Sequence, residues 1–144
     1  MKRRFIAAVV AGSLLASFSV WASDDEEFFL EPRTHNGVVY LSGGVGADER
    51  DAMQAVQHEY TLWLSFEHEG ESVLSSDTEV AIRDAKGRLV LEAEAEGPWL
   101  MVKLPAGRYR VTAKQEDQSG SQIVAVGSKG VTRRAIRFQG KEKS

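Results

Sequence analysis

The 144-residue sequence contains no cysteine and only three histidines. The absence of cysteine excludes thiol nucleophiles, disulfide bonds, cysteine-bound zinc, iron–sulfur clusters and a lipid anchor on an N-terminal cysteine. The sequence also lacks the alternation of strands and helices that is typical of parallel α/β folds. Hydrophobic residues make up 42% of the chain and charged residues 27%, which is the composition of one ordinary globular domain.

Long hydrophobic runs are absent as well. The segment 5–18 is uncharged and mostly apolar, but its ~14 residues fall short of the ~20 that span a bilayer. It follows Lys2, Arg3 and Arg4 and precedes small residues, as in a secretory signal peptide. We therefore predict that residues 1–22 are removed by a cut after Ala22, which makes the mature chain periplasmic or secreted. The alternative, an uncleaved anchor, is disfavoured because acidic residues at 24–27 follow in place of a basic flank.

Positive charge is scarce in the mature chain. The leader carries three of the 18 basic residues and none of the 21 acidic ones, so 15 basic and 21 acidic residues remain, a net charge of -6. This balance disfavours binding to nucleic acid or to anionic lipid. Acidic residues gather at 24–31, and basic residues gather near the end, at Lys129, Arg133, Arg134, Arg137, Lys141 and Lys143. These ends are either solvated, paired with each other, or, for the basic strand, offered to an acidic partner.

Apolar residues alternate with a period of two in seven segments at intervals of roughly ten residues, separated by turn residues. This spacing predicts an all-β fold, a seven-stranded Greek-key sandwich over residues 59–138 with a basic tail at 139–144. The predicted strands are 60–66, 80–82, 89–93, 99–104, 109–113, 123–126 and 131–138.

The preceding segment, residues 23–58, is predicted to be an acidic extension with little core of its own. Weak alternation predicts an extra edge strand at 37–44. One short amphipathic helix is expected before the first core strand, capped by Asp48 and ending near His58. Its apolar residues are Ala52, Met53, Ala55 and Val56.

The glycine-rich segment 43–46, GGVG, superficially resembles a phosphate-binding loop. It has no following Gly-Lys-Ser/Thr, and the acidic residues Asp48, Glu49 and Asp51 would repel a phosphate at the helix start. We interpret it as a flexible linker that turns the chain into the helix.

Metal and catalytic motifs are missing. The densest set of candidate ligands is His58, Glu67, His68, Glu69 and Glu71. On a strand, residues 67, 69 and 71 share one face and His68 points to the other, so they form no single ligand set. The sequence has no G-x-S-x-G, S-x-x-K or H-E-x-x-H motif. We therefore expect no metal, no cofactor and no enzymatic activity, while a triad assembled only in space stays an alternative.

Three aromatic residues, Trp63, Trp99 and Tyr109, are candidates for binding or for the core. Tyr109 follows a Pro-Ala-Gly turn, so we expect it to be buried with its hydroxyl bound to nearby backbone, as in the corner tyrosines of other sandwiches. Trp63 lies on the opposite strand face from Leu62 and Leu64 and is predicted to be exposed, with Trp99 intermediate. Exposed rings stack on sugars or on apolar groups of a partner.

The segment 84–115, DAKGRLVLEAEAEGPWLMVKLPAGRYRVTAKQ, resembles the carboxypeptidase regulatory-like domains. Their signature is a strand, a D-x-x-G turn, a second strand and then L-P-x-G-x-Y-x-V. It matches here at Asp84, Gly87, Leu104, Pro105, Gly107, Tyr109 and Val111. The resemblance implies a transthyretin-like (prealbumin-like) β-sandwich, which in larger enzymes is an accessory module without catalytic residues. The peptidase domain itself is missing from this sequence.

We therefore predict a non-catalytic exported module that binds a protein in the periplasm or cell envelope. The alternative is a carbohydrate-binding module that uses an exposed Trp63 or Trp99 against a glycan. The candidate binding residues are Trp63, Trp99, Arg133, Arg134 and Arg137. A long bare edge strand would favour a protein partner, an exposed Trp63 among polar residues would favour a sugar, and a pocket holding His58 and His68 would favour an enzyme.

Overall fold

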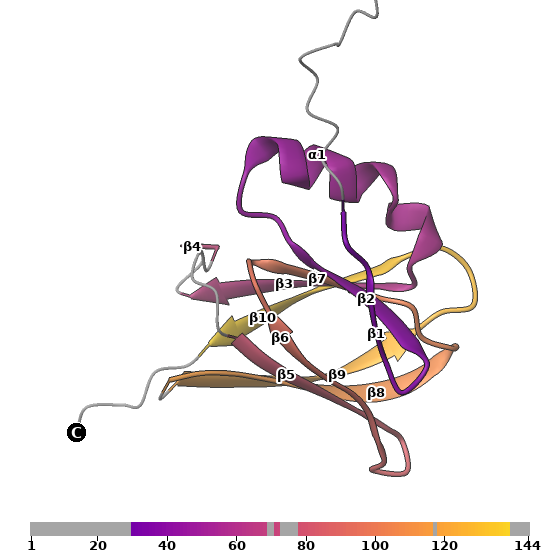
Figure 1. Cartoon of the computed structure of the whole chain (residues 1–144). Coiled ribbons are helices and arrows are strands. Elements are labelled where there is room, and N and C mark those ends of the chain that lie inside the picture. The colour runs from indigo at the N-terminus through magenta and orange to yellow at the C-terminus, as the bar shows by residue number, and fades with distance from the viewer. Residues whose placement is uncertain (1–29, 69–70, 73–77, 117, 139–144) are drawn as a thin grey trace, which may run out of the picture.

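A computed structural model describes residues 30–68, 71–72, 78–116 and 118–138 of the chain. They form two β-sheets packed face to face, with one α-helix on the outer side of one sheet (Figure 1). The predictions of an all-β sandwich and of one short α-helix before the first core strand are therefore confirmed. The predicted signal peptide, the acidic residues 23–29 and the basic tail at 139–144 lie outside the described residues.

Sheet A has the strand order β1-β2-β7-β3-β10, and the short β4 also pairs with β3. β10 runs parallel to β3, whereas the other pairs are antiparallel. The strands are β1 (Arg33–His35), β2 (Val38–Gly43), β3 (Leu62–His68), β4 (Glu71–Ser72), β7 (Trp99–Val102) and β10 (Thr132–Phe138).

The edge strand predicted at 37–44 is present as β2, but it is not at the edge, because β1 pairs outside it. Asn36 and Gly37 have φ angles of 49° and 81° and form the turn between the two strands. An Asn-Gly pair is the preferred sequence for a two-residue hairpin, because both residues accept positive φ. Part of the predicted acidic extension therefore belongs to sheet A.

Sheet B is antiparallel throughout, in the order β6-β5-β8-β9. Its strands are β5 (Thr78–Asp84), β6 (Leu89–Ala95), β8 (Gly107–Gln115) and β9 (Gln118–Val126). Each of the seven strands predicted from the alternation coincides with an observed strand, namely β3 and β5 to β10. The hairpin β1–β2 and the short β4 are additional.

The main core lies between the two sheets. On β3 the residues at even positions, such as Leu62 and Leu64, face sheet B and are fully buried. The facing side chains of sheet B alternate in the same way, as expected for strands with one buried face. Besides Leu62 and Leu64, the largest fully buried members are Phe66, Ile82, Leu91, Leu100 and Ile136.

A second apolar cluster lies on the outer face of sheet A, where α1 (Ala47–Ala55) and the 3-10 helix η1 (Gln57–Glu59) cover it (Figure 1). Its buried members are Leu41, Met53, Tyr60, Trp63 and Met101. The helix buries Met53 in this cluster. This contact stabilises the helix, because a helix of nine residues gains its stability mainly from packing and not from helix propensity.

The prediction that Asp48 caps this helix is wrong. Gly46 is the N-cap, and no side chain caps the helix. Asp48 lies in the first turn, where its charge suits the helix dipole. The carboxylate of Glu49 instead accepts hydrogen bonds from the backbone N–H groups of Gly44 and Val45.

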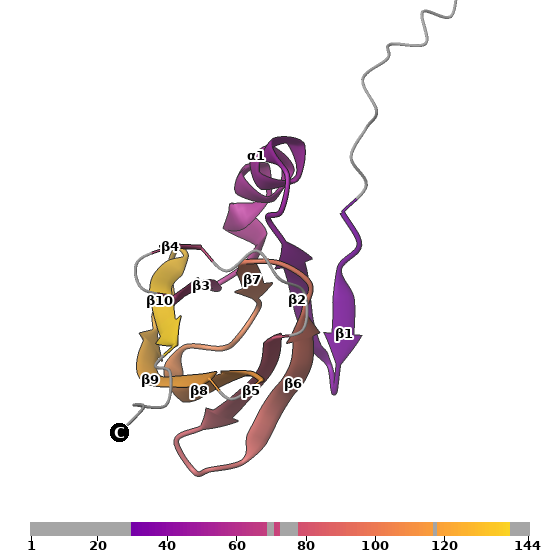
Figure 2. The same ribbon diagram turned by 90° about the vertical axis from the view of Figure 1, so that its left-hand side faces the viewer.

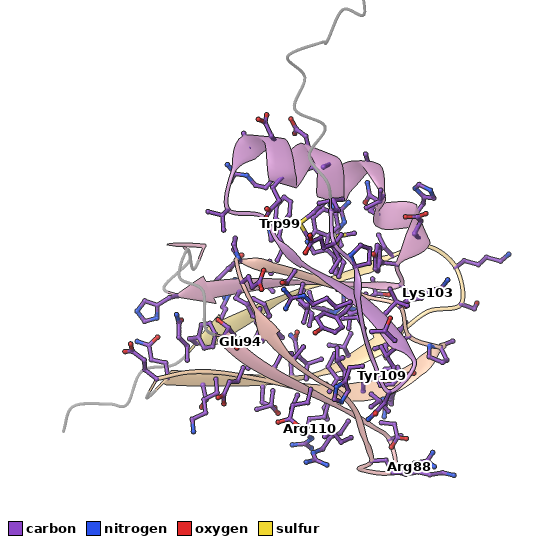
Figure 3. The ribbon with its side chains drawn as sticks, in the orientation of Figure 1. Arg88, Glu94, Trp99, Lys103, Tyr109 and Arg110 are labelled. Carbon is purple, nitrogen blue, oxygen red and sulfur yellow. The ribbon has the colours of Figure 1, made fainter. Side chains whose placement is uncertain are left out.

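Two turns of sheet B carry the motif residues. The Tyr109 hydroxyl donates a hydrogen bond to the carbonyl oxygen of Pro105 at 2.7 Å, and Tyr109 is buried, as predicted for a corner tyrosine (Figure 3). Burial, with a smaller contribution from the charge of Asp84, raises the pKa of Tyr109, so the hydroxyl stays protonated. Gly87 has a φ of 80°, which the D-x-x-G turn requires of its last residue.

Replacing Tyr109 by phenylalanine should lower the free energy of unfolding by about 1 kcal/mol, because the part-buried hydrogen bond from its hydroxyl to the Pro105 carbonyl oxygen is lost. Chemical denaturation measures the change, and Tyr40→Phe is the matched control. Tyr40 is buried, and its hydroxyl makes no hydrogen bond with the described residues. Equal stability of Tyr109→Phe and the wild type would contradict the role of the hydroxyl.

Asp84 should make stability depend on pH. Its carboxylate accepts hydrogen bonds from the backbone of Arg88 and Lys86 and from the Arg88 guanidinium. The backbone N–H of Arg88 is the largest cause that holds the pKa of Asp84 below its ordinary value of 3.8. The stabilisation is therefore complete above about pH 4 and is lost as the pH falls through the lowered pKa. The stability difference between wild type and Asp84→Asn should stay constant from about pH 6 to about pH 4 and shrink as the pH falls below about 4, and a constant difference down to about pH 3 would refute the assignment.

Candidate functional site

The predicted binding residues meet in part on the outer face of sheet A, beside α1. A shallow surface depression of about 320 Å³ lies there, and we call it the Trp–Arg depression. It is lined by Trp63, Ser65, Trp99, Arg133, Arg134 and Ala135. Four of the five residues predicted for binding thus line one surface feature, although they come from three strands.

Strand register explains why these residues meet. The parallel pairing of β3 with β10 places Arg133 beside Trp63 and Ala135 beside Ser65. The antiparallel pairing of β3 with β7 places Trp99 on the other side of Ser65. Residues two apart on a strand share a face, so Ala135 lies on the same face as Arg133. The small side chains of Ser65 and Ala135 therefore form a low floor between Trp99 and Arg133. The hollow exists because Ser65 and Ala135 are small.

Trp63 is buried, with 5% of its surface exposed, so the prediction of an exposed ring is wrong. Its strand face was predicted correctly, but α1 and η1 cover that face. The ring contacts Trp99 edge-on, with centroids 4.8 Å apart and planes at 72°. The Arg133 guanidinium lies 4.4 Å from its centroid and covers it further. Trp63 supports the depression and offers no free stacking surface.

Trp99 is half-buried, as predicted, and lies beneath α1 (Figure 3). It packs against the backbone of Gly44, where an added Cβ would lie 3.0 Å from the indole ring. Gly44 also has a φ of 94°. The glycine-rich segment predicted to be a flexible linker is thus fixed at this point by close packing and by a glycine-type conformation.

Two arginines bring positive charge to the depression. Arg133 donates through Nη2 to the Gln57 side chain of η1, and Arg134 donates through Nη1 to the Arg133 carbonyl oxygen at 2.7 Å. Neither forms an ion pair with the carboxylates of the described residues, in contrast to Arg33, Arg88 and Arg137. Two guanidinium groups therefore remain available to an anionic ligand, and guanidinium binds carboxylates in bidentate geometry.

Arg137 lies outside the depression. The register sets it beside Glu67, and its Nε lies 3.7 Å from a carboxylate oxygen of Glu67. Both groups are accessible to solvent, so this pair contributes little to stability.

The histidines considered for metal or acid–base chemistry are not brought together. His58 lies on η1 next to the start of β3, and His68 ends that strand, ~20 Å away at the usual rise per residue. Within the described ranges, no group of three or more acidic or histidine side chains is arranged to hold a metal ion. Glu69 lies outside those ranges. The helices that the structure describes are too short and too polar to cross a membrane.

Sequence reasoning missed Ser65, Ala135 and Gln57. The two small residues carry no motif, and their role follows only from the register of three strands. Gln57 could be found only once η1 was known to pack beside β10.

No protein-family model matches this chain, and no curated protein matches it. Among solved structures it is similar to one titled "Crystal Structure of S.CueP", with a TM-score of 0.44 and 12% sequence identity. The similarity covers 54% of this chain and 62% of that chain, so this chain spans less than two thirds of the other. A likeness this weak transfers no function.

Replacing Arg133 by methionine should lower the free energy of unfolding by about 1 kcal/mol, because it removes the cation–π contact with Trp63. Arg134→Met, which removes the same charge without a ring contact, is the matched control and should change stability less. Thermal or chemical unfolding followed by tryptophan fluorescence measures both. Identical stabilities of the two variants would show that the Arg133–Trp63 contact contributes nothing.

Proposed function

We propose that this chain is a non-catalytic, exported module that binds an acidic segment of a protein partner at the Trp–Arg depression. The observation that carries the proposal is the pair Arg133 and Arg134, which lie beside the half-buried Trp99 without a carboxylate partner among the described residues. Arginine and tryptophan are enriched where protein partners bind, because they combine a polar group with a large apolar surface.

The shape of the depression supports a side chain as the ligand. Its floor of Ser65 and Ala135 is small and open, and its charged groups lie along one side. A carboxylate from a partner would meet Arg133 and Arg134, while adjacent apolar atoms of the partner would cover the exposed part of Trp99. Charge complementarity of this kind speeds association and selects the partner.

Export and the finer fold are parts of the same proposal. The leader at 1–22, cut after Ala22, would deliver the chain to the periplasm or the exterior. The seven core strands, the D-x-x-G turn at Asp84 and the Tyr109–Pro105 hydrogen bond support a transthyretin-like sandwich of the carboxypeptidase regulatory-like type. The protein partner is favoured over a glycan, because burial of Trp63 removes the platform on which the carbohydrate alternative mainly relied.

Site-specific photo-cross-linking in cells tests the proposal. A photoreactive residue replaces Glu67, which follows Ser65 on the same face of β3, and the control carries it at Thr112 on the outer face of sheet B. We expect one cross-linked protein from position 67 and none from position 112. The chain is expressed with its own leader, and a captured chain that begins at Ser23 would match the predicted cut.

The role of the positive charge of Arg134 in partner binding is tested in the same cells. Arg134→Glu should abolish capture from position 67, whereas Arg108→Glu, the same charge change on exposed sheet B, should not. Capture that is insensitive to Arg134→Glu, or equal from both positions, would contradict an acidic partner at the depression.

A further inference from the structure

The edges of both sheets lie together on one lateral side of the sandwich. β9 ends sheet B and β10 ends sheet A, and the two strands lie one above the other (Figure 2). Among the described residues, no backbone hydrogen bond joins them. The opposite side is closed by contacts between β2 or β1 and the segment after β6, including the ion pair of Arg33 with Glu96 at 2.9 Å.

β9 is a long edge strand that lacks the usual protection. All nine of its residues pair with β8, so its other edge presents alternate N–H and C=O groups. Its sequence, QSGSQIVAV, contains no charged residue and no proline. Edge strands normally carry lysine, proline or a bulge, which prevent another strand from adding. Ile123 is 60% exposed on this strand, next to the free edge.

β10 offers positive charge beside this edge. The Thr132 N–H donates to the Thr61 carbonyl oxygen on the β3 side, so the backbone groups of Arg133, Ala135 and Arg137 point away from β3. The Arg134 guanidinium donates a hydrogen bond to the Arg133 carbonyl oxygen. This contact uses one of the three carbonyl oxygens on the outer edge of β10, so β10 is less suited than β9 to accept a strand, while its arginines remain close to β9.

The two edges approach closely at one point and leave a gap beside it. A Cβ on Gly120 would lie 2.5 Å from the Arg137 carbonyl oxygen, so glycine permits the contact. Next to it lies an opening of about 400 Å³, lined by Ser121, Gln122, Ala135, Ile136 and Arg137. Gln122 lies two residues before the buried Val124 on β9, and Arg134 lies two residues before the buried Ile136 on β10. Both positions are therefore on the core side of their strands, yet both residues are exposed. The sandwich is therefore open between β9 and β10, with polar residues at the opening.

We propose that the free edge of β9 binds an extended acidic segment of a partner protein, which adds to sheet B as a strand. The inference rests on the proposed function, since it specifies how a partner of that module binds. Side chains on one face of the added strand point across the opening toward Arg134 and Arg137, and those on the other face lie beside Ile123 and Ala125. The segment that fits alternates acidic and aliphatic residues, because side chains of a strand alternate between its faces.

The probe is a nine-residue peptide of alternating glutamate and valine, the length of β9. Binding to the mature chain is measured by fluorescence anisotropy, and amide hydrogen exchange of β9 is followed by NMR. We expect alternate amides of β9, those that point away from β8, to become protected on binding. A lysine–valine peptide should not bind. N-methylation of one alternate set of peptide amides should abolish binding, whereas methylation of the other set should not, because only one set faces β9.

Variants of the chain test whether the positive charges of Arg134 and Arg137 contribute to peptide binding. Arg134→Glu with Arg137→Glu should weaken binding about tenfold or more, because two favourable charge contacts become repulsive. Arg50→Glu with Lys103→Glu is the matched control, since both residues are exposed and lie away from β9. Equal weakening by both pairs would mean that net charge alone drives binding and would overturn the assignment to this edge.

Ser65→Trp separates this inference from the proposed function, because it fills the Trp–Arg depression and leaves β9 unchanged. Protection of β9 that persists in Ser65→Trp supports strand addition. Peptide binding that is lost in Ser65→Trp and never protects β9 overturns the inference and leaves the depression as the binding site. If β9 is protected without peptide and the chain sediments as a dimer, a second copy occupies the edge, and the inference of a partner protein fails.

Discussion

The parallel pairing of β10 with β3 is the constraint on which the rest of the site depends. It fixes Arg133 beside Trp63 and Ala135 beside Ser65, and so it decides where charge, aromatic surface and space occur on sheet A. A shift of one residue would turn Arg133 and Arg137 toward the core and the apolar residues Ile136 and Phe138 toward solvent. Burial of Ile136 and Phe138 therefore holds Arg133 on the outer face of sheet A, beside Trp63.

The N-terminal third of the described chain decides which part of sheet A remains accessible. The hairpin β1–β2 extends the sheet, and α1 with η1 covers the apolar face around Met101 and Trp63. The cover ends where the small residues of the depression begin. One α-helix thus both completes the second apolar cluster and sets the border of the candidate binding surface, so fold stability and the proposed partner binding depend on the same segment.

The strand alternation in the sequence was enough to predict the two sheets, the inward residues and the turns. Leu62, Leu64 and Phe66 alternate with Trp63 and Ser65, and a period of two has one physical meaning, a strand with two different faces. The Asn-Gly turn at residues 36 and 37 was an equally local signal for β1, although weak alternation around it concealed the strand. The motif around Tyr109 was local too, because its hydrogen bond joins residues four apart.

The sequence by itself therefore determined the fold class, the strand faces and the excess of acidic residues. It also excluded the chemistry that cysteine would have supplied, because the chain contains none. Only the tertiary structure decided that Trp63 is buried, that Ser65 and Ala135 form the floor of a depression, and that β9 and β10 leave an opening between them. Alternation assigns a residue to a face, but it does not say what covers that face. Cover and register come from contacts between segments far apart in sequence, and these depend on the packing of the whole domain.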